Sequence, residues 1–160
     1  MEKKSAFVQE IYTECEINAP ARDVYSVISD FTSYSTWTDE ITISGETRPG
    51  GKMRVNVKTA NNGKKWFKLS STMEKNNGRM ITFKNVMLAP FIFLGKHRFE
   101  IIPLSEDITR FINAEVFSGL AVPFVRKKSL LQNTRRFKES VNLAPKNRVE
   151  LPGNRKGTIL

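Results

Sequence analysis

The feature that most constrains this chain is a long central stretch, residues 41–117, in which apolar and polar residues alternate. At 52–59, for example, Met53, Val55 and Val57 are separated by charged or amide side chains. Successive side chains of a strand point to opposite faces, so a period of two predicts strands with one buried face. The stretch is therefore expected to form a sheet rather than helices.

Turn sequences divide the stretch into antiparallel strands. Asn-Asn-Gly occurs at 61–63 and again at 76–78, and Asn and Gly tolerate the positive φ that tight hairpins require. Between these turns, residues 65–75 place Phe67 on the apolar side, and Phe83 follows on an alternating segment after the second turn.

A further hairpin is predicted from residues 93–103 and 109–117, with Pro103 opposite Thr109. A slip of one residue would turn every side chain to the other face, so this register can be tested. In this register His97 pairs with Glu115 and Phe99 with Asn113. The predicted inward face holds Phe93, His97, Phe99, Ile101, Phe111, Glu115 and Phe117.

Helical patterns precede and follow the sheet region in the sequence. Residues 9–18 alternate as a first strand, and Pro20 can then occupy the first turn of a helix. An apolar stripe follows from Val24 to Phe31 at helical spacing, and a second short helical turn is expected around residues 34–37. The order of strand, two short helices, antiparallel strands and one long helix is typical of the α+β class.

The last helix is predicted to run to about Leu143 and to be ended by Pro145, which lacks an N–H to donate. Its inner stripe consists of Leu130, Thr134, Phe137 and Val141. Its exposed surface carries Arg126, Lys127, Lys128, Arg135, Arg136 and Lys138. We expect one domain at 1–145 and a basic, poorly ordered tail at 146–160.

Positive charge is concentrated at the end of the chain. Residues 121–160 hold ten Lys or Arg and two Asp or Glu, whereas residues 1–120 hold 16 and 14. Such a segment can attract nucleic acid or anionic lipid. No nucleic-acid-binding motif accompanies it, so we expect no nucleic-acid partner and interpret the charge as a solvated helix face and tail. A protein-interaction surface on this helix is an alternative.

Three segments carry a resemblance to a known family. INAPARDVYSVISDFTSYSTW at 17–37 is similar to its opening, residues 94–104 with 109–123 to its paired late strands, and residues 135–150 to its closing helix. The family is the START-like, or SRPBCC, superfamily, in particular its polyketide cyclase/dehydrase-like group. The resemblance implies the helix-grip fold: a curved antiparallel sheet wrapped around a long C-terminal helix, with two short helices after the first strand. It also implies a cavity between the sheet and that helix.

The predicted function is binding of a small hydrophobic ligand, whether aromatic, polyketide-like or lipid-like, in this cavity. The eleven Phe residues bring bulk without a polar group, which suits a core or an apolar pocket. Members of the superfamily carry lipids or catalyse cyclisation, so the fold alone does not decide between these functions. The predicted ligand-binding residues are Tyr34, Trp37, Val55, Phe67, Phe83, Phe93, Phe99, Phe111, Asn113, Phe117, Phe137 and Val141.

An alternative is an enzyme of the polyketide cyclase/dehydrase type. His97 and Glu115 are the acid-base candidates on the inward face, and a carboxylate beside an imidazole is expected to raise the imidazole pKa. The same pair would equally serve as a structural hydrogen bond or as an anchor for the polar end of a ligand.

Other classes are not favoured. One Cys and one His make a metal site improbable and exclude an intrachain disulfide, and no cofactor-binding motif occurs. The sequence has neither the apolar segment of a signal peptide nor a run of about 20 apolar residues. We therefore expect a cytoplasmic protein without a transmembrane segment, and the sequence leaves its oligomeric state open.

Overall fold

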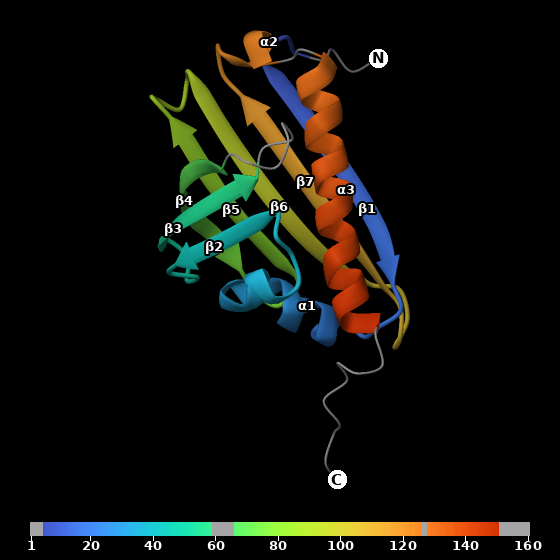
Figure 1. Ribbon diagram of the computed structural model, residues 1–160. Helices are drawn as coiled ribbons and strands as arrows, with labels where there is room; N and C mark the ends of the chain where they lie inside the picture. The colour runs from blue at the N-terminus through green and yellow to red at the C-terminus, as the bar shows by residue number, and fades with distance from the viewer. Residues whose placement is uncertain (1–4, 59–65, 126–127, 151–160) are drawn as a thin grey trace.

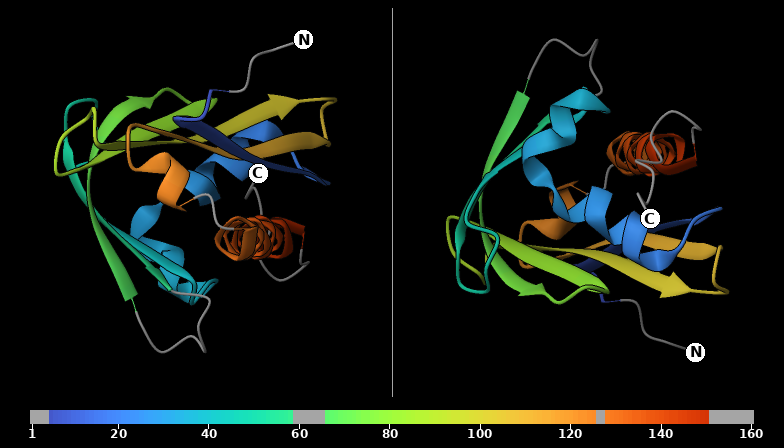
Figure 2. Two further views of the ribbon diagram at one scale, coloured as in Figure 1. Left: turned by 90° about the horizontal axis from the view of Figure 1, so that it is seen from above. Right: turned by 90° about the horizontal axis from the view of Figure 1, so that it is seen from below.

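The structure is a computed structural model that describes residues 5–58, 66–125 and 128–150. One antiparallel sheet of seven strands has the order β1-β7-β6-β5-β4-β3-β2. It curves around the last helix, as the views along the helix axis show (Figure 2). The strands are β1 (Val8–Ile17), β2 (Ile41–Gly45), β3 (Lys52–Lys58), β4 (Trp66–Asn76), β5 (Met80–Met87), β6 (Phe93–Pro103) and β7 (Thr109–Ser118).

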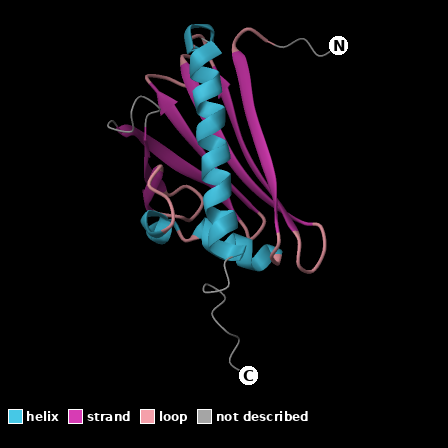
Figure 3. Cartoon of the chain, turned by 45° about the vertical axis from the view of Figure 1, so that its right-hand side comes forward, coloured by secondary structure: helices cyan, strands magenta, loops and turns pink. Residues whose placement is uncertain are grey.

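The helices lie on the concave side of the sheet (Figures 1 and 3). Helix α3 runs along β1 and β7, and α1 packs near its C-terminal end. The helical elements are α1 (Ala21–Ser29), the 3-10 helix η1 (Phe31–Thr36), α2 (Val122–Val125) and α3 (Lys128–Glu150). This is the helix-grip fold that the sequence predicted. None of the helices in the described residues is long and apolar enough to cross a membrane.

The register predicted for the last hairpin is confirmed. Pro103 pairs with Thr109, and His97 pairs with Glu115. Phe99 and Phe111 are consequently buried in the core, whereas the intervening Arg98 is half exposed on the other face. The alternation therefore decided which side chains face α3.

The first strand and the first turn of helix also match their patterns. Ile11 and Ile17 of β1 are buried, and Pro20 directly precedes α1, which buries Val24 and Ile28. The Asn-Asn-Gly turn at 76–78 joins β4 to β5, with Gly78 at φ 86°. The predicted turn at 61–63 lies outside the described residues.

Helix α3 continues beyond the predicted end, so the prediction that Pro145 stops it is wrong. Pro145 removes one intrahelical hydrogen bond, yet it is buried and the next turn is held to β1. Lys146 Nζ donates to the carbonyl of Glu16 (2.8 Å), and the amide of Asn18 donates to Glu150 Oε1 (2.6 Å). Residues 146–150 are therefore part of the helix, and the remainder of the predicted tail lies outside the described residues.

Candidate functional site

Six polar side chains meet in the interior between the sheet and α3, and we call them the polar cluster. They come from β1, β6, β7 and α3, and all but Glu115 are buried. The pleat of the strands turns the sheet residues inward, and a spacing of four aligns the two helix residues on one face. The polar cluster consists of Thr13, His97, Asn113, Glu115, Lys138 and Asn142.

Lys138 is the central cation of the polar cluster. Only 1% of the residue is exposed. Its Nζ donates to Asn113 Oδ1 at 3.0 Å and lies 3.3 Å from Glu115 Oε2. Burial lowers the pKa of Lys138, and the neighbouring carboxylate of Glu115 opposes that shift. The prediction that Lys138 lies on the exposed face of the helix is therefore wrong.

The remaining hydrogen bonds fix the cluster to the strands. Asn113 Nδ2 donates to Asn142 Oδ1 (3.0 Å), and Asn142 Nδ2 donates to Thr13 Oγ1 (3.1 Å). Thr13 Oγ1 in turn donates to the carbonyl of Asn113 (3.0 Å). Asn113, predicted to bind a ligand, thus has both side-chain polar atoms engaged within the protein.

His97 forms the apolar edge of the polar cluster. Its ring stacks on Phe83 with centroids 4.9 Å apart and meets Phe99 edge-on at 4.6 Å. Nδ1 lies 3.8 Å from Glu115 Oε2, which is too long for a hydrogen bond. Nε2 is buried and has no hydrogen-bond partner among the described residues. One polar atom is therefore available on an otherwise aromatic surface.

The protonation of His97 differs from the sequence-based prediction. Burial, and after it the charge of Lys138, lower the pKa of His97 well below its ordinary 6.5, whereas the interaction with Asn113 acts in the opposite direction. The prediction that Glu115 would raise this pKa is wrong, because Lys138 already pairs with that carboxylate. His97 is neutral at pH 7.

This shift predicts that acid destabilises the protein as the pH falls below about 6.5. Folded His97 stays neutral while the unfolded chain binds a proton near pH 6.5, so lowering the pH favours the unfolded state. We expect the free energy of unfolding, measured by urea denaturation, to fall by about 1 kcal/mol by pH 5.5. The chain has one histidine, so His97→Gln should remove this slope. An equal slope in the variant would contradict the assignment.

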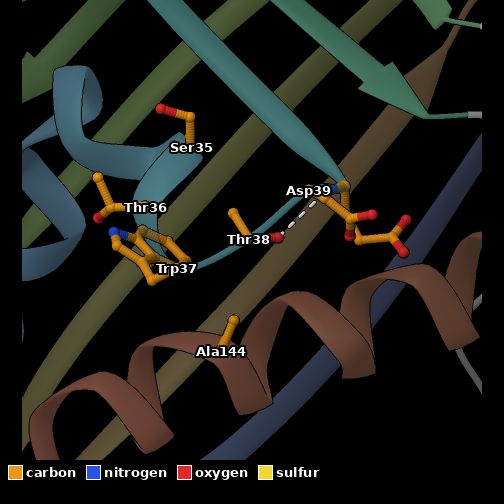
Figure 4. A pocket seen from close by; sticks show the side chains of 7 residues that line it. Ser35, Thr36, Trp37, Thr38, Asp39 and Ala144 are labelled. Carbon is orange, nitrogen blue, oxygen red and sulfur yellow. Dashed lines mark hydrogen bonds between the residues drawn. The ribbon is translucent and has the colours of Figure 1, made fainter.

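A second feature is an open groove of about 470 Å³ between α3 and the segment that leads from η1 into β2 (Figure 4). Ala144 of α3 faces the segment that carries Trp37. The Trp37 ring packs on Tyr34 with centroids 4.4 Å apart, and its buried Nε1 has no hydrogen-bond partner among the described residues. The lining residues are Ser35, Thr36, Trp37, Thr38, Asp39, Glu40 and Ala144.

The predicted ligand-binding residues fall into several environments. Val55, Phe83, Phe99, Phe111 and Val141 lie in the hydrophobic core. Tyr34 is also buried there, and its hydroxyl donates to the carbonyl of Ile28 at 2.6 Å. Phe93 and Phe117 are half-buried and pack on each other at 5.5 Å. The side chains of Phe67 and Phe137 lie outside the described residues.

Sequence reasoning missed Lys138 and Asn142. A signal was present, because Lys138 is four residues after Thr134 and three before Val141, both assigned to the inner stripe. The six basic residues along the helix favoured an exposed face, and a lone buried lysine is uncommon unless it is paired. The partner Glu115 was recognised, but only as a partner of His97.

Comparison with known families identifies the chain. The sequence model of the family described as polyketide cyclase / dehydrase and lipid transport matches residues 8–140. The chain belongs to this family. The match extends from β1 into α3 and includes the whole sheet, which agrees with the resemblance seen in the sequence. Comparison with curated protein sequences gave no match.

Solved structures share the fold at low sequence identity. The Zhui aromatase/cyclase from Streptomyces sp. R1128 superposes with a TM-score of 0.73 at 17% identity, covering 89% of this chain and 94% of that one. A START superfamily protein from Mycobacterium smegmatis gives a TM-score of 0.69 at 21% identity, with coverages of 88% and 97%. These similarities establish the helix-grip fold of this family member; they do not assign its ligand or reaction.

Proposed function

We propose that this family member binds a small, mainly apolar molecule with one polar end between the sheet and α3. The observation that carries the proposal is the buried Nε2 of His97, which lies among aromatic rings and has no hydrogen-bond partner within the described part of the chain. A buried polar atom without a partner is unfavourable by about 1–3 kcal/mol. A ligand group that hydrogen-bonds to Nε2 would remove that penalty.

The surroundings of His97 restrict the class of ligand. Phe83 and Phe99 offer ring faces and edges to a flat or flexible apolar body. Because the imidazole is neutral, Nε2 is suited to a hydrogen bond with a hydroxyl or another uncharged polar group of the ligand. Aromatic, polyketide-like and lipid-like compounds with a hydroxyl fit this description.

The groove beside Trp37 is the proposed entrance. Its volume lies within the range of small-molecule sites, and Trp37 stands between the groove and the core cluster. Movement of Trp37 would open the interior without disturbing the hydrogen bond that holds Tyr34. The family description and the name of one similar structure are consistent with this proposal. The description includes lipid transport, and the Zhui protein is an aromatase/cyclase.

A matched pair of probes tests the proposal. We expect 2-naphthol to bind more tightly than naphthalene by about fivefold, because one hydrogen bond to a buried acceptor is worth about 1 kcal/mol. Quenching of tryptophan fluorescence measures both affinities, and Trp37→Phe identifies the reporting residue against the exposed Trp66. His97→Phe should bind both probes equally. Equal binding of the two probes by the unaltered protein would exclude His97 as the polar anchor.

A second candidate is acid-base catalysis on the same ligand. It is favoured by the neutral His97 beside the Glu115–Lys138 pair, since a neutral imidazole can accept a proton at Nε2. Incubation with poly-β-ketone analogues followed by mass spectrometry separates the two functions. Loss of water that stops in His97→Phe indicates an enzyme, and saturable binding without a change in mass indicates a carrier.

A further inference from the structure

Large apolar side chains are exposed at one end of the molecule, the end at which α2 lies and which is opposite to α1 (Figure 1). Three segments meet there: the start of β1, the loop between β5 and β6, and the segment around α2. Leu88 is 88% exposed, Phe91 68% and Phe124 79%. We call the following residues the tip patch: Phe7, Met87, Leu88, Phe91, Leu120 and Phe124.

Hydrogen bonds join the three segments into one surface. The amide of Leu120 donates to the carbonyl of Phe91, and the amide of Gly119 donates to the carbonyl of Phe7, both at 3.0 Å. Gly119 has φ 120°, and a Cβ there would lie 2.5 Å from the Ile92 carbonyl oxygen. This close approach requires glycine. The loops therefore pack against each other and form one surface.

The backbone also holds Leu88 outward. Leu88 has φ 66°, a left-handed conformation that is unfavourable for a residue with a Cβ. Its side chain is nevertheless almost completely exposed to water. In the free protein this leucine therefore contributes almost no hydrophobic stabilisation that would offset the unfavourable backbone conformation. A strained position that presents leucine to solvent indicates that the side chain is used when the protein meets another surface.

The two segments that carry most of the tip patch contain no acidic residue. Residues 86–99 and 116–138 contain no Asp or Glu. Arg126, Lys127 and Lys128 follow Val125 directly in the sequence. The first of these cations is two residues from Phe124 in the sequence.

We propose that the tip patch docks on an anionic lipid bilayer. Isolated leucine and phenylalanine side chains on loops can insert at the boundary between head groups and acyl chains, while adjacent cations are attracted to anionic head groups. A protein partner would need a complementary groove for each projecting side chain, whereas a bilayer accommodates them without one. The inference does not depend on which ligand occupies the interior.

Sedimentation with vesicles tests the proposal on the full chain. We expect binding to phosphatidylcholine vesicles that contain phosphatidylglycerol, weaker binding without the anionic lipid, and weakening by salt. Phe91→Ser combined with Phe124→Ser should lower the partition coefficient by about tenfold or more, because two large apolar groups no longer insert. The matched control is Leu104→Ser with Ile108→Ser, two exposed apolar residues at the other end of the β6–β7 hairpin, which should bind as the unaltered protein does.

Three results would overturn the proposal. The first is no association with anionic vesicles. The second is association that the serine substitutions at Phe91 and Phe124 leave unchanged, which would assign binding to the basic residues alone. The third is a concentration-dependent dimer in solution that these substitutions dissociate, which would assign the tip patch to a second copy of the chain. All four substituted sites are exposed, and unfolding curves check that each variant remains folded.

Discussion

Replacement of Glu115 by Gln should lower the free energy of unfolding by about 3–5 kcal/mol, as measured by urea denaturation. Lys138 is buried, and Glu115 is its carboxylate partner at 3.3 Å. Removing one member of a buried ion pair leaves the other charge without compensation in a medium of low polarity. The bond from Lys138 to Asn113 remains, but a neutral amide does not balance a positive charge.

The double variant separates this electrostatic effect from a loss of packing. Lys138→Met alone should also destabilise, because it leaves the Glu115 carboxylate unpaired. Lys138→Met together with Glu115→Gln should be more stable than the sum of the single effects predicts, by about 1–3 kcal/mol, since neither charge remains. Additive losses would show that the pair is not coupled.

A surface pair on the same helix is the control. Arg135 and Glu139 lie 3.4 Å apart with side chains 65% and 56% exposed. Exposed pairs at this spacing contribute about 0.3–0.5 kcal/mol, so Glu139→Gln should change stability by no more than that. A loss of less than about 1 kcal/mol for Glu115→Gln would place its carboxylate in the same class and contradict a buried pair.

The second large effect is expected at Phe111. Phe111→Ala should lower the free energy of unfolding by about 3–5 kcal/mol, because the ring is completely buried and packs on Phe99 with centroids 5.6 Å apart. Its removal loses the transfer free energy of the ring and leaves a cavity in the core. Thermal or urea unfolding of the ligand-free protein measures the change.

Phe93→Ala is the matched comparison, since Phe93 lies on the same hairpin and the same inward face. Phe93 is half-buried against Phe117, so we expect a loss of about 1 kcal/mol. The difference between these two losses of unfolding free energy separates the predicted ligand-binding residues into tightly packed ones and less tightly packed ones. Comparable losses at the two positions would mean that the interior is packed evenly along the β6–β7 hairpin.

Much of the fold could be predicted because it rests on local patterns. The alternation in β6 and β7 predicted both the inward face and the pairing of His97 with Glu115, since a slip by one residue would bury Arg98 and expose Phe99. The stripe in α1 and the Asn-Asn-Gly turn at 76–78 are equally local. The predicted end of α3 was wrong because it rested on a local rule about Pro145. Contacts of the last turn with Glu16 and Asn18, which are distant in the sequence, outweigh that rule.

The site was predicted only in part. The sequence by itself determined that His97, Asn113 and Glu115 share one face, because that follows from the period of a strand. Only the tertiary structure decided that Lys138 is buried, that it pairs with Glu115 and that His97 is neutral. Each protonation state depends on burial and on every charge within a few ångströms, and such charges come from elements that only folding brings together.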